Sequence, residues 1–305
     1  MNISITNLCN RRCEYCFQRG WYLSNKAYHD RSVNEMNINV FKDIIRWVGS
    51  QSNISIMGGE PLMHSQIHEI MNYCATLPND ILWISNISIP HELFSRLPWN
   101  SKFGIMANMD WHTQQKNDFL KNLEWLKQQS IDCCLSTTVL PNFNISEFEN
   151  RLDACLKTNS KILSLRLSTA CPSIQQKFVQ FSYDSLIEQI INCISKYNIK
   201  IKFDCPIPLW EIRPETKRIL RMKGVDFNSL SSCYCNPPFD ILWNGDIIWC
   251  SSCSNITTNY KIHNDVKNAR LCLKDKMKAK HGTKIYDISC FAKHERIEHD
   301  KFNSQ

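Results

Sequence analysis

Three cysteines in the spacing C-x3-C-x2-C constrain this chain more than any other feature of its sequence. Cys9, Cys13 and Cys16 lie on one short loop directly after an apolar strand predicted at 3–5. Three thiolates on one loop can hold three irons of a four-iron, four-sulfur cluster and leave the fourth iron without a protein ligand. A zinc site would need a fourth ligand nearby, and the next histidine is His29. The spacing therefore favours a cluster with one open iron.

A second motif follows the second apolar strand, predicted at 54–57, and reads Gly58-Gly59-Glu60-Pro61. Together with Tyr15 before the third cysteine, these motifs resemble the radical S-adenosylmethionine (radical SAM) enzymes. The resemblance implies that the open iron chelates the methionine moiety of S-adenosylmethionine. It also implies that one electron from the cluster cleaves the sulfonium to a 5'-deoxyadenosyl radical, which then abstracts a hydrogen atom from a substrate.

The resemblance assigns roles to the second motif as well. In that family the Gly-Gly-Glu-Pro segment binds the methionine amino group, for which a close-approaching glycine backbone and a carboxylate are suitable. Gly58, Gly59, Glu60 and Tyr15 are thus predicted to bind S-adenosylmethionine. Taken alone, the segment would be an ordinary turn at the end of a strand.

Composition bounds the class of protein. The chain has 305 residues, of which 43% are hydrophobic and 21% charged, and this is typical of globular chains of about two domains. Sixteen cysteines without a secretory signal favour reduced, metal-binding thiols and a cytoplasmic location. No apolar run approaches the roughly 18 residues of a membrane span, so no membrane is expected.

Short apolar strands alternate with amphipathic helical stripes over the first two thirds of the chain. This alternation predicts a parallel sheet and, with the resemblance, an α/β fold: a partial (β/α)6 TIM-like barrel over 1–205. The six predicted strands are 3–5, 54–57, 81–85, 103–107, 133–139 and 162–167.

Chemistry in parallel βα folds collects at the carboxyl ends of the strands. Asn86 follows the third predicted strand, Asn108 and Asp110 follow the fourth, and Arg166 lies in the sixth. By resemblance, Asn86, Asn108 and Arg166 are predicted to contact the ribose and carboxylate of S-adenosylmethionine. The alternative is that these side chains satisfy backbone groups at the barrel end.

Cys171 and Cys205 lie in strand-end or loop segments, each before a proline. A thiol facing the site can return a hydrogen atom to a substrate radical, a role known among radical SAM peptide epimerases. We treat both as candidate catalytic hydrogen donors, with loop packing as the alternative.

From residue 206 the alternation stops, and residues 206–305 are predicted to form a small Cys-rich domain with a β-hairpin and a helix. The hairpin spans 239–250, with Asn244-Gly245 as its turn. Six cysteines within this part are predicted metal ligands: Cys233, Cys235, Cys250, Cys253, Cys272 and Cys290.

This segment resembles the SPASM/twitch extension that follows many radical SAM barrels. Eleven residues separate Cys233 from Gly245 and four separate Gly245 from Cys250, as in that pattern, and a start at Cys235 also fits. The later run of closely spaced cysteines is missing, so one auxiliary 4Fe-4S cluster is expected in addition to the first cluster. A zinc site with four thiolates is the alternative.

Two enzyme hypotheses follow from the resemblance. In the first, the protein modifies a peptide substrate by hydrogen abstraction, giving an epimer or a thioether or carbon-carbon crosslink. Because the cysteine loop begins at residue 9, we expect no leader-recognition domain before it. In the second, the substrate is a small molecule such as a sugar, aminoglycoside or nucleoside. Either enzyme would take its electron from a reductant such as flavodoxin or ferredoxin.

A third hypothesis comes from a different class, a non-catalytic zinc-binding module. Its basic stretch, with lysines at 274, 276, 278 and 280, would bind nucleic acid. It leaves the Gly-Gly-Glu segment and the βα repeat unexplained. We therefore expect a solvated helix face and no nucleic-acid partner.

Overall fold

The structure is a computed structural model, and it describes residues 1–13, 15–16, 30–49, 53–140, 142–169, 183–197, 199–203, 213–222, 239–249 and 256–281. These residues form a ten-stranded sheet in the order β10-β9-β8-β1-β2-β3-β4-β5-β6-β7. Neighbouring strands from β1 to β7 are parallel. Their bounds are β1 Asn2–Thr6, β2 Ile54–Gly58, β3 Ile81–Ser85, β4 Phe103–Asn108, β5 Asp132–Val139, β6 Ser164–Thr169 and β7 Lys200–Phe203.

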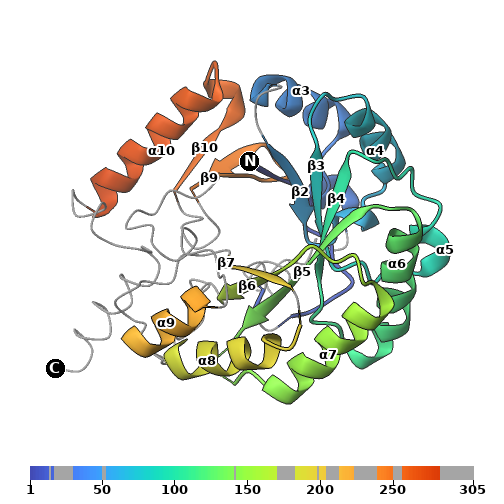
Figure 1. The fold of residues 1–305 in the computed structure, drawn as a ribbon. Helices are drawn as coiled ribbons and strands as arrows, with labels where there is room; N and C mark the ends of the chain where they lie inside the picture. Colours follow the sequence, from blue (N-terminus) through green and yellow to red (C-terminus); the bar gives the residue numbers. More distant parts are fainter. Residues whose placement is uncertain are drawn as a thin grey trace.

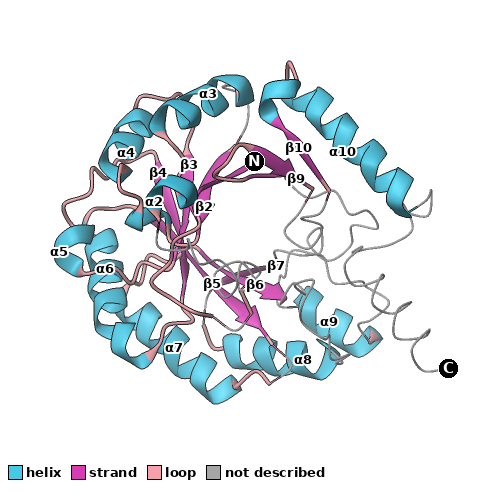
Figure 2. Cartoon of the chain, turned by 180° about the vertical axis from the view of Figure 1, so that it is seen from behind, coloured by secondary structure: helices cyan, strands magenta, loops and turns pink. Residues whose placement is uncertain are grey.

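Helices connect these strands and lie on the outer side of the curved sheet, as Figures 1 and 2 show from opposite sides. Their bounds are α2 Arg31–Asn34, α3 Ile38–Val48, α4 Ile67–Ala75, α5 His91–Phe94, α6 Lys116–Gln128, α7 Ile145–Thr158, α8 Tyr183–Ile194 and α9 Pro214–Met222. This arrangement confirms the partial βα barrel expected from the sequence.

The core lies between the sheet and this layer of helices. In α3, the side chains of Phe41, Ile44, Ile45 and Val48 are buried, as expected for one face of a helix with 3.6 residues per turn. Asn37 begins the helix because its side chain accepts a hydrogen bond from Asn39 N. Burial of one such aliphatic or aromatic side chain contributes about 2 kcal/mol, so the stripe fixes the helix on the sheet.

All six predicted strands are present, and β7 adds a seventh parallel strand to them. Ile201 and Phe203 are buried in β7, whereas Lys200 and Lys202 are exposed. This alternation is typical of a strand with one face on a core. At only four residues, the strand is a weak pattern in the sequence.

The predicted hairpin is also present, formed by β8 (Asp240–Ile241) and β9 (Asp246–Ile248). Gly245 supplies the turn with φ +85°, and a Cβ there would lie 2.8 Å from the ring of Tyr260. β8 pairs in parallel with β1, so the hairpin continues the barrel sheet at its first edge. The division of the chain near residue 205 stays a prediction.

Strand β10 (Thr257–Asn259) and helix α10 (Val266–His281) complete this edge. The helix buries Ala269, Leu273 and Met277 and carries the four lysines of the basic stretch. Among the described residues, none of the helices combines the length and the apolar character needed to cross a lipid bilayer.

Candidate functional site

The cysteine loop begins where β1 ends. Cys9, Cys13 and Cys16 are each partly exposed. Cys16 N donates to Cys13 O at 3.2 Å, and Arg11 N donates to Cys9 Sγ at 3.3 Å. Burial and the neighbouring Glu60 raise the pKa of the Cys9 thiol to about 12, and burial raises the pKa of Cys13. These surroundings disfavour the thiolate form of Cys9 and Cys13, whereas a bound metal ion would favour it.

The three thiols of the cysteine loop are candidate ligands of an iron-sulfur cluster. Within the part of the chain that the structure describes, no group of three or more His, Cys, Asp or Glu side chains is placed to hold one metal ion. An iron-sulfur cluster takes its thiolates on different irons, so its ligands need not converge on one point. The loop thus offers the ligand set of a three-cysteine cluster.

Gly58 and Gly59 bring the end of β2 against the start of the cysteine loop. Gly59 N donates to Thr6 O at 2.8 Å, and Glu60 N donates to Leu8 O at 2.7 Å. A Cβ on Gly58 would lie 2.3 Å from Thr6 O, and one on Gly59 would lie 2.2 Å from Leu8 O. Any side chain at either position would push the two segments apart.

Glu60 is fully buried, and its carboxylate points into the protein. One oxygen accepts from Ser85 Oγ at 2.7 Å and Leu62 N at 3.1 Å, and the other accepts from Asn86 N at 2.7 Å. Burial raises the pKa of Glu60, while these hydrogen bonds act in the opposite direction. The side chain therefore joins the end of β2 to the end of β3.

Asn86 and Asn108, both predicted site residues, lie against the cysteine loop. Asn86 Nδ2 donates to Asn10 Oδ1 at 2.8 Å and contacts Cys9 Sγ at 3.8 Å. Asn108 Oδ1 accepts from Arg11 Nη1 at 3.0 Å. The ends of β3 and β4 thus both contact the loop that carries the cysteines.

Tyr15 reaches across to Asp110, which follows β4. The Tyr15 hydroxyl donates to Asp110 Oδ2 at 2.8 Å, and the same oxygen accepts from Thr138 N at 3.0 Å. Thr137 Oγ1 donates to the other oxygen at 2.5 Å. Burial, followed by the nearby Asp110 carboxylate, raises the pKa of Tyr15. The phenol therefore stays protonated and acts as a donor.

The remaining predicted site residues are spread over the chain. Arg166 is partly exposed in β6, in register with Ser136 of β5. Cys272 is partly exposed in α10, with its Sγ 3.9 Å from Thr258 Oγ1. The others lie outside the described residues: Cys171, Cys205, Cys233, Cys235, Cys250, Cys253 and Cys290.

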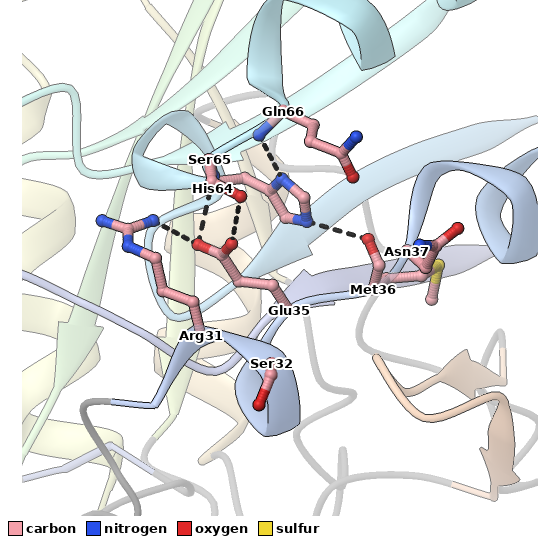
Figure 3. Close-up of a pocket in the computed structure, with 8 residues that line it drawn as sticks. All are labelled: Arg31, Ser32, Glu35, Met36, Asn37, His64, Ser65 and Gln66. Carbon is pink, nitrogen blue, oxygen red and sulfur yellow. Dashed lines mark hydrogen bonds and ion pairs between the residues drawn. The ribbon is translucent and has the colours of Figure 1, made fainter.

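A pocket of about 300 Å³ lies next to the Gly-Gly-Glu-Pro turn (Figure 3). In it, Glu35 accepts hydrogen bonds from Arg31 and from the backbone and side chain of Ser65. Gln66 N donates to His64 Nδ1 at 3.0 Å, so the opposite ring nitrogen carries the proton and donates to Met36 O, also at 3.0 Å. These contacts tie α2 and the residues after it to the turn.

Several residues of the site escaped the sequence analysis. Arg11 was seen only as a spacer between cysteines, and Ser85, Ser88 and Gln115 were not considered. Asp110 was noted for its place after β4 but received no role. Its position two residues after Asn108, at a carboxyl end, was the one signal available in the sequence.

Comparisons with known proteins find no matching family model. An S-adenosylmethionine-dependent nucleotide dehydratase of Selenomonas ruminantium is 29% identical over 106 residues, which are 32% of this chain and 35% of that protein. A GTP 3',8-cyclase of Clostridium acetobutylicum is 24% identical over 220 residues, 69% of this chain and 57% of the cyclase. The chain thus aligns with about a third and somewhat over half of these relatives' lengths.

Solved structures share the fold at low identity. Streptococcus suis SuiB bound to its precursor peptide SuiA superposes with TM-score 0.64 at 13% identity, over 96% of this chain and 71% of SuiB. Native anSMEcpe, with bound AdoMet and the Kp18Cys peptide, superposes with TM-score 0.59 at 13% identity, over 95% of this chain and 87% of anSMEcpe. The likeness thus extends over nearly the whole chain.

Proposed function

We propose that this chain is a radical SAM enzyme that cleaves S-adenosylmethionine reductively and abstracts a hydrogen atom from a peptide substrate. The observation that supports the proposal is that two motifs are in contact at the carboxyl ends of β1 and β2. The loop with Cys9, Cys13 and Cys16 follows β1, and the backbone of Gly59 and Glu60 is hydrogen-bonded to the start of that loop.

Cys9, Cys13 and Cys16 would hold a 4Fe-4S cluster. When bound, the cluster and S-adenosylmethionine supply the electron and the 5'-deoxyadenosyl radical for hydrogen abstraction. We assign cofactor contacts to Gly58, Gly59, Tyr15, Asn86, Asn108 and Arg166. We assign a cofactor contact to Glu60 as well, because its buried carboxylate is held by Leu62, Ser85 and Asn86 and keeps one further acceptor position.

The fold neighbours crystallised with peptides, SuiB and anSMEcpe, support a peptide as the substrate. A small molecule is the second candidate, because the two sequence relatives described above are named for reactions of nucleotides. The peptide reaction would be an epimerisation or the formation of a thioether or carbon-carbon crosslink. Cys171 and Cys205 remain the candidate hydrogen donors for an epimerisation.

We further propose one auxiliary 4Fe-4S cluster in a twitch-like domain over 206–305, with ligands among the six cysteines predicted there. The single one of these that the structure describes is Cys272, on α10. Iron per chain near eight would support this proposal, and iron near four would refute it. Flavodoxin or ferredoxin is the expected reductant, and the cytoplasm is the expected location.

The test of the activity is anaerobic reconstitution with iron and sulfide, followed by dithionite, S-adenosylmethionine and candidate substrates. We expect 5'-deoxyadenosine to form and Cys13→Ala to abolish it. Cys193→Ala is the matched control, because Cys193 is partly exposed on α8. A Cys13→Ala protein that still forms 5'-deoxyadenosine would contradict the cluster assignment.

Substrate class is tested in the same assay. In deuterated water, a peptide that is epimerised takes up one deuterium per turnover, and a crosslinked peptide loses two mass units. Nucleotides and amino sugars are run in parallel. Stimulation of 5'-deoxyadenosine formation by these alone, and by none of the peptides, would favour the second candidate.

A further inference from the structure

Arg11, between the first and second cysteines, is a buried cation. Its side chain is 3% exposed, and every nitrogen of the guanidinium donates. Nε donates to Gln115 Oε1 at 3.0 Å, and Nη1 donates to Asn108 O at 3.1 Å and Asn108 Oδ1 at 3.0 Å. Nη2 donates to Asn86 O at 3.1 Å and Ser88 Oγ at 2.5 Å. The fork thus holds the loop on the ends of β3 and β4.

All of these acceptors are neutral. Among the described residues, no carboxylate forms an ion pair with Arg11, although such pairs occur elsewhere in the chain. A buried charge is costly unless an opposite charge compensates it. Arginine does not escape this cost by losing its proton, because its pKa is too high. The groups that accept hydrogen bonds from Arg11 thus carry no negative charge, and the Glu60 and Asp110 carboxylates attract the cation only through space.

The cysteine loop would supply a further negative charge beside Arg11 once a cluster is bound. Arg11 N donates to Cys9 Sγ at 3.3 Å, and Cys13 follows two residues later. Three thiolates give a bound cluster a net negative charge, and one-electron reduction adds another. A fixed positive charge nearby favours the reduced form.

We propose that the Arg11 cation offsets part of the negative charge of the cluster and thereby raises its reduction potential. In addition, its hydrogen bonds hold the cysteine loop on the ends of β3 and β4. This inference rests on the proposed function only in that a cluster binds to Cys9, Cys13 and Cys16. Arg11 is a positioning residue whose charge acts through space, so its effect is visible without substrate and without turnover.

The test compares Arg11→Gln, Arg11→Lys and Arg12→Gln. The first removes the buried charge, and the second keeps the charge but not the five-donor fork. Arg12→Gln is the matched control, because Arg12 is exposed on the same loop and its charge is screened by solvent. The readout is the midpoint potential of the reconstituted cluster, titrated under EPR without S-adenosylmethionine, together with iron content and a circular dichroism spectrum.

We expect Arg11→Gln to disfavour reduction about tenfold, which is a fall of about 59 mV for one electron. For Arg11→Lys and for Arg12→Gln, the midpoint potential should change by no more than about a third of that shift. If Arg11→Gln takes up no iron but Arg11→Lys does, the loop requires the charge and the proposal stands.

Two outcomes overturn this role of the Arg11 charge. One is an Arg11→Gln protein with full iron and an unshifted potential. The other is a loss of iron from both the Gln and the Lys variants, which would show that Arg11 only holds the cysteine loop in place. Wild-type protein that binds no iron-sulfur cluster would instead refute the proposed function, so the two failures are distinguishable.

Discussion

Glu60 and Asp110 both follow a strand at the carboxyl edge of the sheet, but their surroundings differ. Glu60 is fully buried and takes all of its hydrogen bonds from neutral donors. Asp110 keeps 13% of its side chain exposed and has Arg151 3.8 Å away as an ionic partner. Glu60 joins two strand ends, whereas Asp110 joins the cysteine loop, β5 and helix α7.

The two carboxylates therefore have different roles in the site. Three donors hold the Glu60 carboxylate in one orientation, so Glu60 fixes the ends of β2 and β3 relative to each other. Asp110, in contrast, is still partly exposed to solvent and accepts a hydrogen bond from the Tyr15 hydroxyl of the cysteine loop. A change at Glu60 should cost mainly stability, and a change at Asp110 should act mainly on the loop.

The largest expected effect comes from breaking the backbone contact that brings Glu60 into place. In Gly59→Ala the new Cβ would lie 2.2 Å from Leu8 O and 2.8 Å from Asn7 O, both backbone atoms that cannot turn away. We expect a loss of about 3 kcal/mol in the free energy of unfolding, measured with urea.

Gly104→Ala is the control for Gly59→Ala. The nearest atom to its Cβ would be Leu82 Cδ1 at 3.7 Å, an ordinary contact. We expect a change within about 1 kcal/mol of zero. Equal stability of the two variants would show that the close packing of Gly59 on the cysteine loop is not required.

A smaller effect is expected from Glu60→Gln. The amide has one oxygen in place of two, so its NH2 group must face either Asn86 N–H or the pair formed by Ser85 and Leu62. One buried donor is left unpaired, at a cost of about 2 kcal/mol. Glu69→Gln, at an exposed position of α4, should change stability by less than about 0.5 kcal/mol. A Glu60→Gln protein as stable as this control would remove the distinction between the two carboxylates.

A double-mutant cycle with Tyr15→Phe and Asp110→Asn tests the contact between Asp110 and the cysteine loop. The two side chains share a 2.8 Å hydrogen bond, so their effects should not add. We expect a coupling free energy of about 1 kcal/mol in urea unfolding. Tyr15→Phe combined with Glu69→Gln should be additive, and additivity of the first pair would refute the contact.

Much of this architecture could be predicted from the sequence, because apolar periodicity reports which faces are buried. The six strands and the hairpin turn at Gly245 were predicted in this way. β7 was missed because lysines occupy two of its four positions, so that its pattern resembles a polar connector. The cysteine loop was found because its spacing is specific.

The polar contacts of the site were beyond such reasoning. Arg11 bonds Gln115, 104 positions away, and Asn86, 75 positions away. Periodicity does not report which donor meets which acceptor across the barrel end. Glu60 shows the same limit, because the sequence indicates a carboxylate at the strand end but not the direction in which it points.

The smallest expected effect concerns His64, just beyond the Glu60 turn. His64 is 2% exposed and neutral, with one ring nitrogen accepting from Gln66 N and the other donating to Met36 O. Burial lowers its pKa, although Glu35 acts in the opposite direction and Arg31 acts with burial. Protonation would break the bond from Gln66 N and place a charge in the core.

Because the folded-state pKa lies below the unfolded value of about 6.5, the unfolded chain binds the proton first as the pH falls. The stability that His64 contributes is therefore complete above pH 6.5 or so and is lost as the pH falls through the folded-state pKa. The slope from this one group cannot exceed about 1.4 kcal/mol per pH unit. Urea unfolding between about pH 5 and 8 should show a shallower acid limb for His64→Gln than for wild type. His68→Gln removes an exposed imidazole from α4 and is the control. If both variants keep the wild-type slope, His64 does not contribute to acid sensitivity and the Glu60 turn is stabilised without it.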